Sequence, residues 1–212
     1  MSKISLYAVS AVALFMSGLA QASVVASFPP NQTCGSDLNS FLEADNFMIA
    51  APTEITQVKF WALIDTPADF TGSVDWAFYS DLLGMPNASV ASGNALASGV
   101  ATGQTTFGLN EFAYTFAVDV NLTPGAYWLV LHNGPSAAIP STTFYWAWAG
   151  DSGDSVSQDL SVASSWAGNS SELAFALTAA DTAAPEPVST VLVGCGIAAG
   201  CLLRRKQKGA KG

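Results

Sequence analysis

A strict alternation of apolar and polar side chains is the sequence feature that most constrains how this chain folds. Between Phe112 and Val120 every second residue is apolar, and Thr115 and Asp119 are among the residues between them. A period of two places one set of side chains on each face of a β-strand, so this segment is predicted to be a half-buried strand. The same pattern predicts further strands at residues 55–63, 73–78, 126–131, 144–149 and 173–178, and weaker ones at 47–50 and 96–100.

Short runs of turn-forming residues separate these predicted strands. Gly, Pro, Asn, Asp and Thr gather at residues 65–67, 84–87, 123–125, 133–135 and 150–154, where they favour tight connections. Between the two ends of the chain, no segment shows helical periodicity over ten residues. Antiparallel strands with short loops predict an all-β fold, an antiparallel β-sandwich of jelly-roll-like type with an aromatic core.

The first residues are typical of a secretory signal peptide. Lys3 precedes an apolar run from Ile4 to Leu19, and the small residues Ala20 and Ala22 flank Gln21. We therefore expect a signal helix in residues 1–22, which signal peptidase removes at the Ala20 and Ala22 motif. A retained membrane helix is the alternative, but the run is short and ends in A-x-A rather than in a basic cluster.

The last residues, 185–212, carry a second apolar segment with different flanks. Pro185-Glu186-Pro187 precedes the uncharged stretch Val188–Leu203, and Arg204-Arg205-Lys206 follows it. The stretch has 16 residues (203 − 188 + 1), about 24 Å of helix, which is shorter than the roughly 30 Å hydrocarbon core of a bilayer. Basic residues stay on the cytoplasmic side, so we expect a short transmembrane helix 188–203 with the rest of the chain outside.

This order of features resembles the PEP-CTERM sorting signal of Gram-negative bacteria. Pro185-Glu186-Pro187, a short Gly-containing apolar helix and a basic end follow one another at the terminus. The resemblance implies recognition by an exosortase, transient anchoring in the inner membrane, and delivery to the cell surface or to an exopolysaccharide or biofilm matrix. Cys195 and Cys201 depart from the commoner family pattern and leave a lipid or thioester role open. The segments 44–47 and 55–61 resemble ectodomains often attached to this tail, which supports the sandwich.

The region between the two ends, residues 23–184, is predicted to be one acidic domain. It spans 162 residues (184 − 22), enough for a single core. All sixteen Asp and Glu residues lie between Asp37 and Glu186, where Lys59 is the only basic residue, so the exported part carries about 1 − 16 = −15. Such a field excludes nucleic acid as an expected partner. Cys34 is the only cysteine of the region, so no disulfide can form within it.

One segment resembles the nucleophile loop of chymotrypsin-like serine proteases, namely Gly150-Asp151-Ser152-Gly153-Asp154. Such an enzyme needs a histidine base beside the serine, and the single histidine, His132, lacks the Ala-rich motif of that family. One histidine and one external cysteine also disfavour a zinc site. A glycosidase would need two carboxylates at a fixed separation, which the sequence does not single out. We therefore expect no enzyme and keep a secreted hydrolase as an alternative.

No resident cofactor is predicted, although weak calcium binding stays open. Asp65 lies near Asp69 in the sequence, and Asp151 lies near Asp154 and Asp159. Their oxygens suit a hard cation, but neither group matches a known calcium-loop spacing. The favoured interpretation is that they are solvated turn residues.

Carbohydrate binding is the first alternative to a purely structural surface protein. Trp61 and Tyr79 are out of phase with the apparent core of their strands, and Trp148 and Trp166 lie in or beside loops. Aromatic faces can stack on sugar rings. Trp61, Trp148 and Trp166 are therefore candidate sugar-stacking residues.

Overall fold

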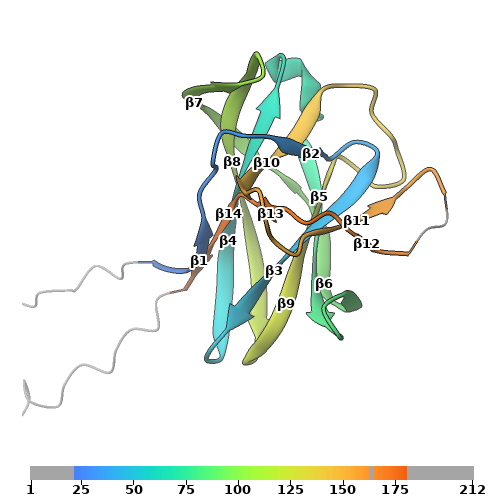
Figure 1. Ribbon diagram of the computed structural model, residues 1–212. Helices are drawn as coiled ribbons and strands as arrows, with labels where there is room; N and C mark the ends of the chain where they lie inside the picture. Colours follow the sequence, from blue (N-terminus) through green and yellow to red (C-terminus); the bar gives the residue numbers. More distant parts are fainter. Residues whose placement is uncertain (1–21, 163–164, 181–212) are drawn as a thin grey trace, which may run out of the picture. The chain divides into compact units, whose positions relative to one another are not determined.

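A computed structural model of the chain describes residues 22–162 and 165–180 (Figure 1). Several predicted features lie outside these residues: Ala20 of the cleavage motif, the sorting motif Pro185-Glu186-Pro187, the stretch 188–203 with Cys195 and Cys201, and the basic residues Arg204, Arg205 and Lys206. Within the described ranges, no helix has the length and hydropathy that crossing a membrane requires.

Two antiparallel sheets make up the domain. The eight-stranded sheet contains β1 (Ser23–Phe28), β2 (Gly35–Asp37), β4 (Thr53–Ile64), β7 (Ser98–Thr106), β8 (Leu109–Leu122), β10 (Phe144–Gly150), β13 (Glu172–Leu173) and β14 (Phe175–Ala179). The six-stranded sheet has the order β12 (Ala167–Gly168), β11 (Val156–Asp159), β3 (Phe41–Ile49), β9 (Gly125–Asn133), β5 (Ser73–Asp81) and β6 (Pro86–Leu96). The only other described element is the 3₁₀ turn Pro67–Asp69, so the expected all-β, antiparallel class is confirmed.

The main hydrophobic core lies between the two sheets, as in a β-sandwich. It draws Phe60 and Trp146 from the eight-stranded sheet and Phe47 and Phe78 from the six-stranded sheet, each at most 3% exposed. Ring contacts cross between the sheets, for example from Phe47 to Phe175 on β14 at 6.2 Å between centroids. Burial of one such aromatic side chain stabilises the fold by about 1.5–3 kcal/mol.

Each sheet also carries a smaller apolar cluster built from the residues that point the other way. On the six-stranded sheet this outer cluster contains Ala44, Ala77, Trp128, Val130 and Val156. The corresponding cluster on the eight-stranded sheet contains Leu63, Ala147 and Ala174. Alternation along a strand assigns these residues to the outer faces, because the sequence neighbours of Trp128, Leu63 and Ala174, for example, lie in the main core.

The predicted strands with strong alternation are confirmed, since β4, β5, β8, β9 and β10 contain them. The expected single strand 173–178 is wrong in one respect, because it divides at Ala174 into β13 and β14. The weak strand 96–100 is also wrong, because Ala97 separates β6 from β7, which belong to different sheets. The Ser-, Gly- and Ala-rich strands β6 and β7 are largely exposed, and without a buried face they show little alternation.

Candidate functional site

The three candidate sugar-stacking tryptophans do not share a face. Trp61 packs beside the outer cluster of the eight-stranded sheet, with the Lys59 ammonium 4.5 Å from its ring centroid. Trp148 packs against the main core, and its indole Nε1 donates to Ser36 Oγ at 3.0 Å. Trp166 packs against the outer cluster of the six-stranded sheet and meets Tyr79 edge to face, with 6.2 Å between ring centroids.

The serine-protease-like segment has no histidine available to it. His132 on β9 is fully buried, and its two ring nitrogens lie 3.0 Å from the Gly134 carbonyl oxygen and 2.9 Å from the Asn39 carbonyl oxygen. In the segment itself, Asp151 accepts hydrogen bonds from the side chains of Asn31 and Thr33. His132 is therefore a structural residue that links the end of β9 to the backbone at Asn39 rather than a base beside Ser152.

Most of the aspartates considered for calcium binding make separate hydrogen bonds and do not lie together. Asp69 accepts a hydrogen bond from the Thr66 backbone N–H at 2.7 Å in the 3₁₀ turn, and Asp159 accepts from the Ser161 hydroxyl at 2.7 Å. Asp151 is engaged as described above. Only Asp154 of the sequence-based candidates joins other carboxylates, and its partners come from elsewhere in the chain.

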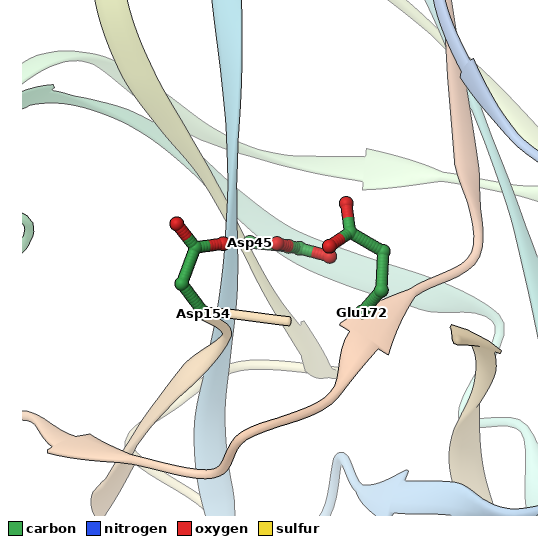
Figure 2. A group of neighbouring side chains, drawn as sticks. All are labelled: Asp45, Asp154 and Glu172. Carbon is green, nitrogen blue, oxygen red and sulfur yellow. The ribbon is translucent and has the colours of Figure 1, made fainter. Parts of the chain in front are cut away.

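Asp45, Asp154 and Glu172 form a group that we call the acidic triad (Figure 2). Asp45 lies on β3, Asp154 in the loop before β11, and Glu172 on β13. One carboxylate oxygen from each lies within 4.8 Å of the others, and Figure 2 shows Asp45 between its two partners. Asp45 shares the inward face of β3 with Phe47, which directs a carboxyl group from one sheet toward a strand of the other.

Backbone and amide groups hold the triad in place. The Leu173 backbone N–H donates to one Asp45 oxygen, and the Asn46 backbone N–H donates to the other at 2.8 Å. The Asn46 side-chain amide donates to Asp154. Each oxygen of the fully buried Asp45 therefore has a donor, which satisfies the group without an opposing charge.

Burial of Asp45 raises its pKa to about 8, against an ordinary value of 3.8. The hydrogen bonds from Leu173 and Asn46 oppose this shift, while the charges of Glu172 and Asp154 add to it. Burial also raises the pKa of Glu172, and the nearby Asp154 adds to that rise. The triad thus favours a shared proton, because an opposite charge is absent from its described surroundings and like charges lie close together.

A second inward carboxyl, Glu43, lies two residues earlier on β3. It is 3% exposed, and its pKa rises to about 9, first because of burial and then because of the charge on Asp37. The Asn169 side-chain amide donates to it at 3.0 Å and opposes the shift. The sequence contained a signal for both groups, since Glu43 and Asp45 are in phase with the apolar residues Phe47 and Ile49.

Chemically, the triad offers only oxygen atoms. Hard cations such as Ca²⁺ take carboxylate and carbonyl oxygens as ligands, so these three residues are the ones that could hold such an ion. Without a cation the same oxygens bind protons, because both kinds of positive charge relieve the repulsion among the carboxylates.

Comparison with known proteins adds no relative. A scan against known protein families found no match, and searches of curated proteins and of solved structures found none either.

Proposed function

We propose that this chain is an exported, non-enzymatic bacterial surface or extracellular-matrix protein with two processed ends. The observation that carries the proposal is the extent of the folded unit, Ala22–Ala180. Its first strand begins at Ser23, directly after the predicted signal peptidase motif, and it ends before the sorting motif Pro185-Glu186-Pro187. The strands of the folded unit thus lie between the two predicted processing sites in the sequence.

The pairing of the first and last strands supports this arrangement. β1 and β14 are antiparallel neighbours, with Ser23 opposite Ala179 and Phe28 opposite Phe175 (Figure 1). The chain therefore enters and leaves the domain at one sheet edge. A domain of this kind can be tethered at either end to the same membrane surface.

The strand order supports the jelly-roll-like part of the proposal. β2, β10, β4 and β8 are neighbours in one sheet, and β3, β9, β5 and β6 are neighbours in the other. Sequential strands such as β3, β4 and β5 alternate between the sheets, as the double Greek key of a jelly roll requires.

The proposed sequence of events uses two processing enzymes. Signal peptidase cuts after Ala22, the C-terminal helix holds the protein in the inner membrane, and an exosortase processes the tail. The domain then associates with exopolysaccharide at the cell surface or in a biofilm. The proposal assigns no resident cofactor and leaves weak calcium binding to the acidic triad.

Mass spectrometry of both chain ends tests the sorting proposal. The full chain is expressed in a Gram-negative host with and without an exosortase, beside a variant in which Pro185, Glu186 and Pro187 are changed to Ala. We expect a mature N-terminus at Ser23 in every case and a shortened C-terminus only with exosortase and an intact motif. The matched control is Asp181→Ala, which alters a nearby acidic residue outside the motif. Identical C-termini with and without the exosortase would overturn the proposal.

A further inference from the structure

The outer face of the six-stranded sheet contains a hollow of about 350 Å³, which we call the outer-face hollow. Its volume falls in the lower part of the range for small-molecule sites, roughly 300–1,000 Å³. Ala77 on β5 lies between Val130 on β9 and Ser92 on β6 in adjacent register positions. The lining also includes Leu42, Asp75, Tyr79 and Ser136. Small side chains at the centre of the row and larger ones beside it produce the depression.

One wall of the outer-face hollow is aromatic. Tyr79 lines it, and Trp166 packs against Tyr79 with ring planes at 74°. Both rings are partly exposed, so the edge-to-face contact leaves ring surface open to a ligand. Below them, Trp128 is fully buried, and its indole Nε1 donates to Asp81 at 2.9 Å, which fixes the supporting layer.

The opposite wall is polar and is already held in place. Asp75 accepts hydrogen bonds from the Ser136 backbone N–H at 2.6 Å and from the Asn94 side-chain amide at 2.8 Å. A carboxylate has about four acceptor sites, so Asp75 can accept further hydrogen bonds. Within the described residues, no hydrogen bond uses the hydroxyls of Ser92 or Ser136. The hollow therefore combines an apolar ring surface with open acceptors and donors.

These features fit the two-sided chemistry of a sugar ring. Its C–H face packs on an aromatic side chain, while its hydroxyls donate to a carboxylate and exchange hydrogen bonds with serines. We propose that the outer-face hollow binds an uncharged sugar unit of an extracellular polysaccharide. This inference rests on the proposed extracellular location and deepens it by naming the matrix component that the domain contacts.

The negative charge of the domain favours neutral polysaccharides over anionic ones. Apart from the buried Glu43 and Asp45, the described residues contain one basic and twelve acidic side chains, 1 − 12 = −11, and Asp75 lies in the hollow itself. Such a surface repels a uronic-acid polymer and leaves the binding of neutral sugars unopposed. Tyr79 and Asp75 are the residues on which the hollow depends most.

Affinity electrophoresis of the full chain in detergent tests the inference. The probes are dextran, galactomannan and soluble β-glucan, with alginate as the anionic comparison. We expect retardation by at least one neutral polymer and none by alginate. For the retained probe, Tyr79→Ala and Asp75→Ala each weaken binding about tenfold, equivalent to about 1.4 kcal/mol, whereas Tyr79→Phe stays near wild type. Trp61→Ala, on the other sheet, leaves binding unchanged.

A blocking variant keeps the test independent of folding defects. Ser92 is exposed on β6, so Ser92→Arg fills the hollow without disturbing the core, and it should abolish retardation. Ser98→Arg, at an exposed position on β7, carries the same charge change and should bind normally. Retention by no neutral polymer, equal retention by alginate, or unchanged binding in Ser92→Arg would overturn the inference. C-terminal processing, measured separately by mass spectrometry, shows whether the sorting proposal fails as well.

Discussion

At the scale of single residues, the inward carboxyl groups of β3 are the least expected part of this domain. Glu43 and Asp45 are 3% and 0% exposed and lie on the face that also buries Phe47. Transfer of an ionised carboxylate into such surroundings is costly unless a positive charge compensates it. Lys59, the only basic residue of the described chain, lies over the Trp61 ring instead, so protonation is the available response.

Stability should therefore fall as the pH rises. The folded-state pKa values of Glu43 and Asp45, about 9 and about 8, exceed the ordinary values of 4.5 and 3.8. Between those limits the folded state binds more protons than the unfolded chain, so the unfolding free energy decreases with pH. We expect the unfolding free energy from urea titrations to decline from pH 5 to pH 9, with a slope of at most about 1.4 kcal/mol per pH unit for each group.

Two isosteric variants separate this effect from general alkaline sensitivity. Glu43→Gln and Asp45→Asn keep the size of each side chain but cannot ionise, so each should flatten the decline. Glu43→Gln should also be more stable than wild type at pH 8, because one amide oxygen can still accept the hydrogen bond from Asn169. Asp45→Asn loses part of this gain, because both Asp45 oxygens accept backbone N–H groups and an amide nitrogen cannot. Asp119→Asn, at an exposed position on β8, is the matched control and should leave the slope unchanged. A wild-type unfolding free energy that rises over this range would contradict the assignment.

Calcium should act on the same repulsion at the acidic triad. At pH 8, millimolar Ca²⁺ can replace the shared proton among Asp45, Asp154 and Glu172. With calcium at ten times its dissociation constant, the stabilisation is about 1.4 kcal/mol, or a rise in Tm of about 3–6 °C for a domain of this size. Thermal unfolding with calcium chloride or EDTA measures this rise. It should be lost in Asp154→Asn and retained in Asp151→Asn, and an equal rise in both variants would exclude the triad.

At the scale of elements, β6 and β7 are exposed edge strands without the usual protection. β6 ends the order of the six-stranded sheet, and β7 pairs only with β8. The chain from Leu82 to Asn110 contains no charged residue, although edge strands of soluble proteins commonly carry charges that prevent pairing with another chain. In an otherwise acidic domain, these two uncharged edge strands are where two copies of the chain approach with the least electrostatic repulsion.

We therefore expect weak self-association of the chain through the edge strands β6 and β7. Val90 on β6 and Val100 on β7 are 46% and 69% exposed, so Val90→Lys and Val100→Lys introduce charge without loss of core packing. Each should weaken self-association of the full chain by about two- to fivefold, the range for a like-charge pair across strands. Sedimentation velocity measures the change. Met48→Lys, at an exposed position on the inner strand β3, is the control, and an equal effect there would point to net charge rather than to the edge.

At the scale of the whole molecule, stability depends on contacts that join the two sheets. Phe47 on β3 contacts Phe78 and Tyr127 within its own sheet and Phe175 on β14 in the other. The described part of the chain contains no disulfide, and Cys34 is a partly buried free thiol. The aromatic packing between the sheets therefore carries the association of the two layers.

A pair of neighbouring variants tests this dependence. Phe47 is 3% exposed and Met48 is 67% exposed, although they are adjacent on one strand. Phe47→Ala should lower the unfolding free energy by about 3–5 kcal/mol because it leaves a cavity between the sheets. Met48→Ala should change it by less than about 0.5 kcal/mol. Urea unfolding measures both, and similar losses would show that the packing between the sheets is not the dominant contribution.

The sequence by itself determined the strands with a buried face. Alternation is a local property of an extended backbone, so the segments within β4, β5, β8, β9 and β10 were predictable from their own residues. The exposed strands β6 and β7 were not predicted correctly, because neither face of these strands is buried enough to produce alternation of apolar and polar residues. Trp166 was a candidate sugar-stacking residue, but its contact with Tyr79 requires the fold to bring residues 79 and 166 together.

Only the tertiary structure decided which residues make up the acidic triad and the outer-face hollow. Asp154 was among the aspartates considered for weak calcium binding, yet its partners Asp45 and Glu172 come from β3 and β13 in different sheets. The register of strand pairing and the crossing between sheets set these distances, and neither follows from periodicity along one segment. The same holds for the outer-face hollow, whose lining comes from the four strands β3, β5, β6 and β9 and from the loop after β9. The chain's local pattern determines which faces are buried, and the packing of sheets determines which side chains meet.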